Sequence, residues 1–168
     1  MTNADRSKIL EWAESHGLKN LEEKIKTAEA LESRSTHIMT ALLAAIGGSL
    51  AFAVKLFAGE KASPIIFASA WLCGYLILVA LFFGATVMRT RRIPAVYSEP
   101  ENLTDHEAQP LDDIRAGLLD DIQKRINEAA LRNDTTARWI NAAILAMILS
   151  PFVFILAALY RIASGGAT

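Results

Sequence analysis

Three histidines and one cysteine are the residues of this chain best suited to bind a metal ion or act as a nucleophile. His16, His37 and His106 each lack a second histidine, cysteine or carboxylate three or four positions away, the spacing that places two ligands on one helix face. Cys73 is the single cysteine and has no partner for a disulfide. The sequence therefore predicts no metal site and no disulfide.

Two acidic pairs, Asp112-Asp113 and Asp120-Asp121, suggest either a cation site or ordinary helix surface charge. Carboxylates in the first turn of a helix are stabilised by the helix dipole. Asp120 and Asp121 also lie four residues before Lys124 and Arg125, the spacing of favourable helical ion pairs. We interpret these acids as helix-start and surface charges.

Catalysis has little support in this sequence. No glycine-rich phosphate loop follows a strand, and no serine lies in a nucleophile elbow. The apolar stretches contain few ionisable or polar groups of the kind that catalysis inside a membrane requires, and these are Lys55, Cys73, Tyr75, Asn141 and scattered hydroxyls. We therefore expect no enzyme, no catalytic residue and no cofactor. The near-zero net charge of −1 also argues against a nucleic-acid partner.

Three long apolar blocks dominate the chain, whose residues are 52% hydrophobic. Ile38–Ala58 contains one charge, and Pro64–Met88 and Trp139–Tyr160 contain none. A bilayer core requires about 20 apolar residues of helix. Core helices of soluble proteins rarely run so long without a charge. The fold class predicted is therefore an all-α integral membrane protein with three transmembrane helices and a cytoplasmic helical bundle formed by extensions of spans one and three.

Basic residues predict the orientation. Segment 1–37 holds 6 lysines and arginines and segment 89–138 holds 8, whereas the opposite side has only Lys55, Lys61 and Arg161. By the positive-inside rule the N-terminus and the middle segment face the cytoplasm and the C-terminus lies outside a bacterial inner membrane. The predicted topology anchors are Arg89, Arg91, Arg92 and Arg138. The Arg89-Thr90-Arg91-Arg92 cluster is alternatively a site for a phosphate ligand or anionic lipid.

The apolar blocks divide the chain into five predicted segments. Cytoplasmic helices occupy residues 1–37, and a transmembrane hairpin occupies 38–88, with spans over 38–58 and 64–88. A cytoplasmic linker and amphipathic helix follow over 89–138, then a third span over 139–161 and a tail over 162–168. Gly17 is a good C-terminal cap, so we expect a first helix to end there and a second to begin at Asn20. That second helix continues without Gly or Pro from Leu21 into span one. The helix that begins near Pro110 either continues straight into span three or bends near Asn133-Asp134-Thr135.

Small residues recur at spacings of four in the spans, which lets helix backbones approach closely in lipid. Such faces serve packing within one chain or between chains. They outnumber the contacts that three helices need, which favours a homo-oligomer. The candidate packing residues are Ala44, Gly47, Gly48, Gly74 and Gly84.

Three further residues are candidates for a pore or gate. Lys55 lies one turn from the outer end of span one, where its stem reaches the headgroups or its charge lines a pore. Pro151 interrupts span three and leaves the Met147 carbonyl without its usual donor, which predicts a kink. Ser150 is placed to satisfy that carbonyl.

The stretch of residues 21–92 resembles, in layout, the small transmembrane effectors of bacterial antiphage systems, the Pycsar-type and SLATT-type membrane proteins. The similarity rests on Leu31-Glu-Ser-Arg-Ser-Thr-His-Ile-Met-Thr40 entering span one and Met88-Arg-Thr-Arg-Arg92 leaving span two. Those families oligomerise and compromise the inner membrane on activation, so the resemblance implies the same for this chain. The third span departs from a two-span pattern, and no ligand-binding residue carries over.

These observations favour a homo-oligomeric inner-membrane effector or pore-forming protein, surrounded by membrane lipid and controlled by a signalling ligand. The alternative is a membrane-anchored scaffold or accessory subunit that docks a soluble cytoplasmic partner on its exposed apolar helix faces.

Overall fold

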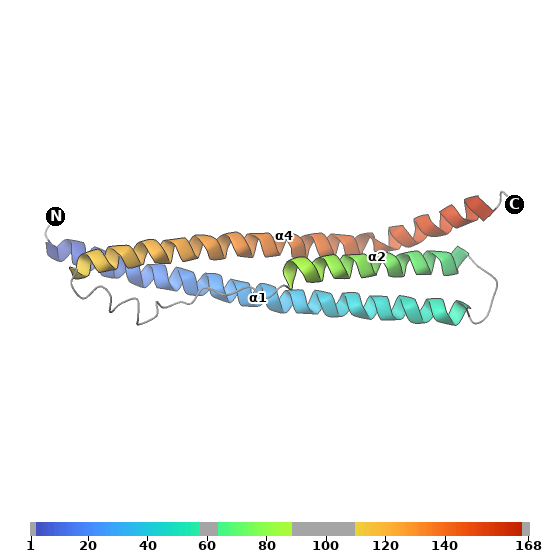
Figure 1. Cartoon of the computed structure of the whole chain (residues 1–168), viewed down its shortest axis with the longest axis horizontal. Helices are drawn as coiled ribbons and strands as arrows, with labels where there is room; N and C mark the ends of the chain where they lie inside the picture. The colour runs from blue at the N-terminus through green and yellow to red at the C-terminus, as the bar shows by residue number, and fades with distance from the viewer. Residues whose placement is uncertain (1–2, 58–63, 89–109, 166–168) are drawn as a thin grey trace. The chain divides into compact units, whose positions relative to one another are not determined.

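A computed structural model describes residues 3–57, 64–88 and 110–165, and all three ranges are helical (Figure 1). Helix α1 runs from Asn3 to Phe57, α2 from Pro64 to Val87 and α4 from Leu111 to Gly165. No strand occurs in these ranges. The all-helical prediction is confirmed for the part of the chain that the structure describes. The predicted outer connection 59–63, the linker 89–109 and the anchors Arg89, Arg91 and Arg92 lie outside the described residues.

All three helices are long and apolar enough to cross a membrane, as predicted. Their apolar stretches are only sparingly covered by the rest of the chain. In the most apolar part of α4 only 6% of the residues are buried. Large side chains such as Val54, Leu81 and Leu156 are at least 60% exposed. These surfaces need a nonaqueous surrounding, because water disfavours so much contiguous apolar area.

The expected break at Gly17 is wrong. Helix α1 continues through Gly17 and Asn20, and no glycine in the described residues has a positive φ. A Cβ atom at Gly17 would lie 3.0 Å from Cγ2 of Ile122. The glycine therefore permits a close approach of α4, rather than the left-handed cap that ends many helices.

The chain divides into two compact units, which share α1 and α4. We call residues 1–31 and 90–135 the polar unit, and residues 32–89 and 136–168 the apolar unit. In the polar unit the first part of α1 packs on the first part of α4. Leu21 is fully buried against Ile122 and Ile126, with Leu18 and Ile25 beside them. The two segments run parallel, since Ser7 contacts Arg115, Gly17 faces Ile122 and Lys24 contacts Asn133.

Buried residues of α1 and α4 follow a seven-residue repeat. On α1, Leu21, Ser35 and Leu42 are separated by multiples of seven. On α4 the buried positions alternate between steps of four and three, with Thr136 the one position of this series that is not buried. The buried residues are Ile122, Ile126, Ala129, Asn133, Ile140 and Ala143. This spacing keeps one seam of a helix facing a partner in left-handed packing.

Asn133 is the polar member of the seam in the polar unit. It is only 8% exposed, and its Nδ2 donates a hydrogen bond of 2.8 Å to the Lys24 carbonyl oxygen. Helix α4 continues through this asparagine without a break. A buried amide that pairs with one particular carbonyl penalises any slip of the two helices, as a buried asparagine does in coiled coils.

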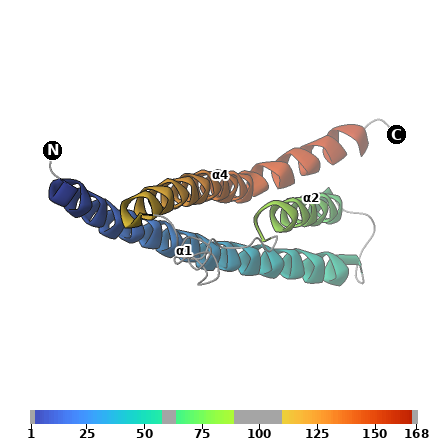
Figure 2. The same cartoon turned by 60° about the vertical axis from the view of Figure 1, so that its left-hand side comes forward.

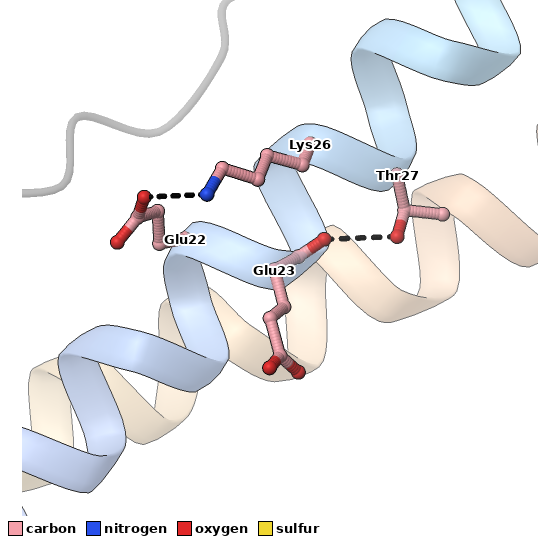
Figure 3. A network of polar contacts seen from close by, with 4 residues as sticks. All are labelled: Glu22, Glu23, Lys26 and Thr27. Atoms are coloured by element: carbon pink, nitrogen blue, oxygen red, sulfur yellow. Dashed lines mark hydrogen bonds and ion pairs between the residues drawn. The ribbon is translucent and has the colours of Figure 1, made fainter.

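Charged residues cover the outside of the polar unit. Glu22 and Lys26 form an ion pair of 2.8 Å one turn apart on α1, next to the hydrogen bond from Thr27 Oγ1 to the Glu23 carbonyl (Figure 3). The hydrogen bond and charge of Lys26 lower the pKa of Glu22, and Glu22 in turn raises the pKa of Lys26. On α4 the predicted Asp121–Arg125 pair is present at 2.6 Å. Such exposed pairs contribute little stability individually, so the apolar seam holds the unit together.

In the apolar unit α2 lies alongside the C-terminal halves of α1 and α4 (Figures 1 and 2). It runs antiparallel to α4, since Phe67 stacks on Tyr160 and Phe82 meets Trp139 edge-on. Most of its buried residues recur at steps of three and four: Ile66, Ser69, Cys73, Leu76, Ala80 and Phe83. This face of α2 is hardly more apolar than the opposite face, because the exposed face is also made of large apolar side chains.

Glycine substitutions test the parallel packing of the polar unit. Gly117→Ala should stabilise the unit by about 0.5–1 kcal/mol, because a Cβ there meets nothing within 4 Å and alanine restricts the unfolded chain. Gly17→Leu should destabilise it by about 1–3 kcal/mol through overpacking against Ile122. Hydrogen exchange of residues 3–31 and 110–135 in detergent measures both effects. Unchanged protection in Gly17→Leu would contradict the close approach.

Candidate functional site

Residues able to bind a metal are scattered across the structure. The described ranges contain no group of three or more histidine, cysteine and carboxylate side chains close enough to hold an ion. His16 bonds to its own helix, with Nδ1–H donating to the Trp12 carbonyl oxygen at 3.1 Å and its ring stacked on Trp12. Cys73 is buried in α2, and His106 lies outside the described residues. Asp113 in the first turn of α4 faces Arg6 at 3.7 Å, which fits the interpretation as helix-start charge.

The candidate packing residues divide into two groups. Gly84 is used within the chain, since a Cβ there would lie 3.1 Å from Cε of Met39 on α1. At Gly47, Gly48 and Gly74 a Cβ would meet nothing within 4 Å. Ala44 is likewise exposed. The structure thus brings one of the five residues into contact between helices and leaves four of them facing outward.

Lys55 lies in the last turn of α1 and is exposed. Within the described ranges it forms no ion pair. A cation at a helix C-terminus is stabilised by the helix dipole. The geometry is compatible with a stem that extends toward a polar boundary and contributes no pore constriction by itself.

Pro151 lies inside α4, and the helix does not break there. Both views show α4 changing direction toward its red C-terminal end (Figures 1 and 2). Ser150 Oγ donates a hydrogen bond of 2.7 Å to the Met147 carbonyl oxygen, the acceptor that proline leaves without its usual amide. The compensation expected from the sequence is therefore present.

Tyr75 of α2 reaches the same turn of α4. Its hydroxyl donates a hydrogen bond of 2.9 Å to the Ala146 carbonyl oxygen. Two consecutive carbonyls, those of Ala146 and Met147, thus accept bonds from side chains just before the proline. In apolar surroundings such bonds matter because water is absent as a competing partner. We call Tyr75, Ala146, Met147, Ser150 and Pro151 the proline site.

Both hydroxyls of the proline site donate hydrogen bonds to backbone carbonyls of α4. The site joins α2 to α4 at the point where the helical ladder of α4 lacks a bond. Loss of the Ser150 bond would leave the Met147 carbonyl without a donor, whereas loss of the Tyr75 bond would remove a contact between α2 and α4. The arrangement is thus suited to hold, or to release, one direction of the C-terminal part of α4.

Three grooves flank the helices of the apolar unit. Two lie between α2 and α4 beside the aromatic contacts of Trp71 and Trp139, with volumes of about 430 and 440 Å³. Their linings are almost wholly apolar. The third, of about 400 Å³, lies between α1 and α4 and has Arg34 and His37 among its lining residues.

Sequence reasoning missed the partners of Tyr75 and Asn133. Asn133 is a buried polar residue of α4 and Tyr75 a partly buried residue of α2, and each bonds to a carbonyl of a different helix. The seven-residue repeat through Ile126, Asn133 and Ile140 is the signal that would have placed Asn133 on a contact face. No comparable repeat identifies the carbonyl that Tyr75 reaches.

The sequence matches no protein-family model, no curated protein and no solved structure. Function is therefore inferred from the residues and geometry of this chain.

Double-mutant analysis tests the proline site. Ser150→Ala should destabilise the protein by about 1 kcal/mol or more, because the Met147 carbonyl loses its donor. In a Pro151→Ala background the same change should cost much less, since the alanine amide supplies the missing bond. Unfolding in mixed detergent measures each free energy. Equal costs of Ser150→Ala in both backgrounds would refute the compensation.

Tyr75→Phe tests the contact between α2 and α4 separately. It should cost about 0.6 kcal/mol, the average for a hydrogen bond between helices in a membrane. Tyr160→Phe is the matched control, since the ring contact with Phe67 survives the loss of its hydroxyl. A larger loss for the control would contradict the role assigned to Tyr75.

Proposed function

We propose that this chain is a three-span membrane protein that assembles with copies of itself and acts as an effector that disrupts a bacterial inner membrane. The membrane part of the proposal is supported by three helices of sufficient length whose large apolar side chains point outward. Lipid is the surrounding that tolerates such a surface. The distribution of lysine and arginine supports an orientation with the polar unit and the N-terminus in the cytoplasm and the C-terminus outside.

One observation carries the proposal of self-assembly: the glycines on the small-residue face of α1 meet no other helix within the described residues. A Cβ at Gly47 or Gly48 meets nothing within 4 Å, whereas Gly84 is closed off by Met39. Adjacent glycines in an apolar helix expose backbone and weaken the helix unless another backbone approaches. A second copy of the chain supplies that backbone, and Gly74 on α2 offers a further open position.

The helices offer a route from signal to membrane. Helices α1 and α4 each contribute residues to both units without interruption, so a ligand that alters the polar unit acts on elements that continue into the apolar unit. The proline site provides a place where α4 can change direction. Similarity in layout to antiphage effectors supports membrane disruption as the output, and the resemblance covers the stretch 21–92.

A membrane-anchored scaffold is the second candidate. It is favoured by apolar side chains exposed on the polar unit, where lipid would not cover them. Trp12 is 63% exposed and Leu131 is 70% exposed. In this function they would dock a soluble cytoplasmic protein.

Substitution of the open glycines tests self-assembly. Gly48→Leu should raise the dissociation constant of the oligomer about tenfold or more, a change of about 1.4 kcal/mol, without unfolding the chain. Sedimentation in detergent measures the oligomer, and circular dichroism checks the helices. Gly84→Leu is the control for damage within one chain, since it clashes with Met39. A monomeric wild-type protein would end the proposal of self-assembly.

Expression in bacteria tests the output. Wild-type chain, with its trigger or at high level, should collapse the membrane potential reported by a voltage-sensitive dye, and Gly48→Leu should preserve the potential at equal expression. An intact potential with a stable oligomer would favour the scaffold instead. In that case Trp12→Ala should abolish binding of the soluble partner and leave the oligomer unchanged.

A further inference from the structure

The third groove of the apolar unit has a polar part, lined by Arg34 and His37, and an apolar part. Its lining residues come from one face of α1 and one face of α4, and they are Arg34, His37, Ile38, Ala41, Ile144, Met147 and Ile148. The four residues from α1 have the spacing 0, 3, 4 and 7, and the three from α4 the spacing 0, 3 and 4, so each set lies on one side of its helix. The two nitrogen-bearing side chains are the first two on α1, and the other lining residues are all apolar.

The change from polar to apolar lining residues coincides with the start of an uncharged stretch in α1. Glu32, Arg34 and His37 are the last titratable residues before an uncharged stretch that begins at Ile38 and continues to Val54. If α1 enters the membrane, Arg34 and His37 therefore lie at the level of the lipid phosphates, and Ala41 lies one turn deeper beside the acyl chains.

Arg34 is available for an anion. It is exposed and forms no ion pair with any residue of ranges 3–57, 64–88 and 110–165. None of the residues lining the groove carries a carboxylate. A guanidinium such as that of Arg34 donates two parallel hydrogen bonds to phosphate oxygens. His37, about one helical turn further along the same face of α1, donates another.

We propose that this groove binds an anionic phospholipid. The phosphate of the headgroup is held between Arg34 and His37, and an acyl chain lies along Ala41 and the apolar side chains of α4. Charge complementarity selects an anionic headgroup over a zwitterionic one, since a positively charged choline would face the same two side chains. The volume of about 400 Å³ and the open side of the groove suit a chain that remains part of the bilayer.

The groove adjoins the proline site. Met147 is one of the residues that line the groove, and its carbonyl accepts the hydrogen bond from Ser150. A bound acyl chain would therefore contact the turn of α4 at which the backbone lacks an amide donor. This inference rests on the proposed membrane insertion and is independent of the proposed self-assembly.

Native mass spectrometry of the full chain tests the site. Delipidated protein in detergent is titrated with dioleoyl phosphatidylglycerol or with dioleoyl phosphatidylcholine. Wild type should bind phosphatidylglycerol the more tightly, and Arg34→Gln should weaken that binding about fivefold. The double variant Arg34→Gln/His37→Gln should bind the two lipids equally. Arg161→Gln is the matched control, because it removes a cation near the other end of α4.

A second pair of variants tests the apolar part. Ala41→Leu fills the groove and should remove the tight binding of phosphatidylglycerol, whereas Ala85→Leu, at an exposed position of α2 outside the groove, should not. Inorganic phosphate should fail to displace the lipid, since it lacks the chain. Displacement by phosphate would show an anion site without a lipid groove and would overturn the proposal.

Membrane insertion is checked independently by flotation with pure phosphatidylcholine vesicles. Failure to float would refute the insertion on which the site depends. If wild type and variants all float but wild type binds phosphatidylglycerol and phosphatidylcholine with equal affinity, the lipid site is refuted. Membrane insertion is then still supported.

Discussion

The seam between α1 and α4 is the constraint on which the rest of the structure depends. In the polar unit Leu21 of α1 packs on Ile122 and Ile126 of α4, and Asn133 bonds to the Lys24 carbonyl. Buried residues recur at multiples of seven on both helices, at Leu21, Ser35 and Leu42 and at Ile126, Asn133 and Ile140. A long helix that keeps this period presents one side to its neighbours over many turns.

Different forces hold the helices together in each unit. In the polar unit the buried cluster around Leu21 is stabilised by removal of apolar area from water. In the apolar unit, if lipid surrounds it, that driving force is largely absent, because lipid is as apolar as the side chains. Contact there depends on close packing, as at Gly84 and Met39, and on hydrogen bonds such as that of Tyr75 to the Ala146 carbonyl.

The proline site and the groove beside it lie at the same turn of α4. Pro151 removes one backbone bond from α4, and Ser150 replaces it with a side-chain bond. The bend is thus held by two hydroxyls, which makes it easier to change than an uninterrupted helix. A lipid or a second copy of the chain that contacts this turn would act on the weakest part of α4.

The sequence by itself determined the three long helices and the compensation at Pro151, because length, absence of charge and a missing amide are local properties of the chain. The sequence predicted a helix end that is absent. Gly17 is typical of a C-terminal cap, yet α1 continues through it, and Ile122 of α4 packs against it. Only the tertiary structure decided which glycines are contacted by another helix. Gly48 and Gly84 look alike in sequence, but Met39 lies beside Gly84 and no described residue lies beside Gly48. The partners of Tyr75 and Asn133 also required it, because a carbonyl more than seventy residues away leaves no local pattern.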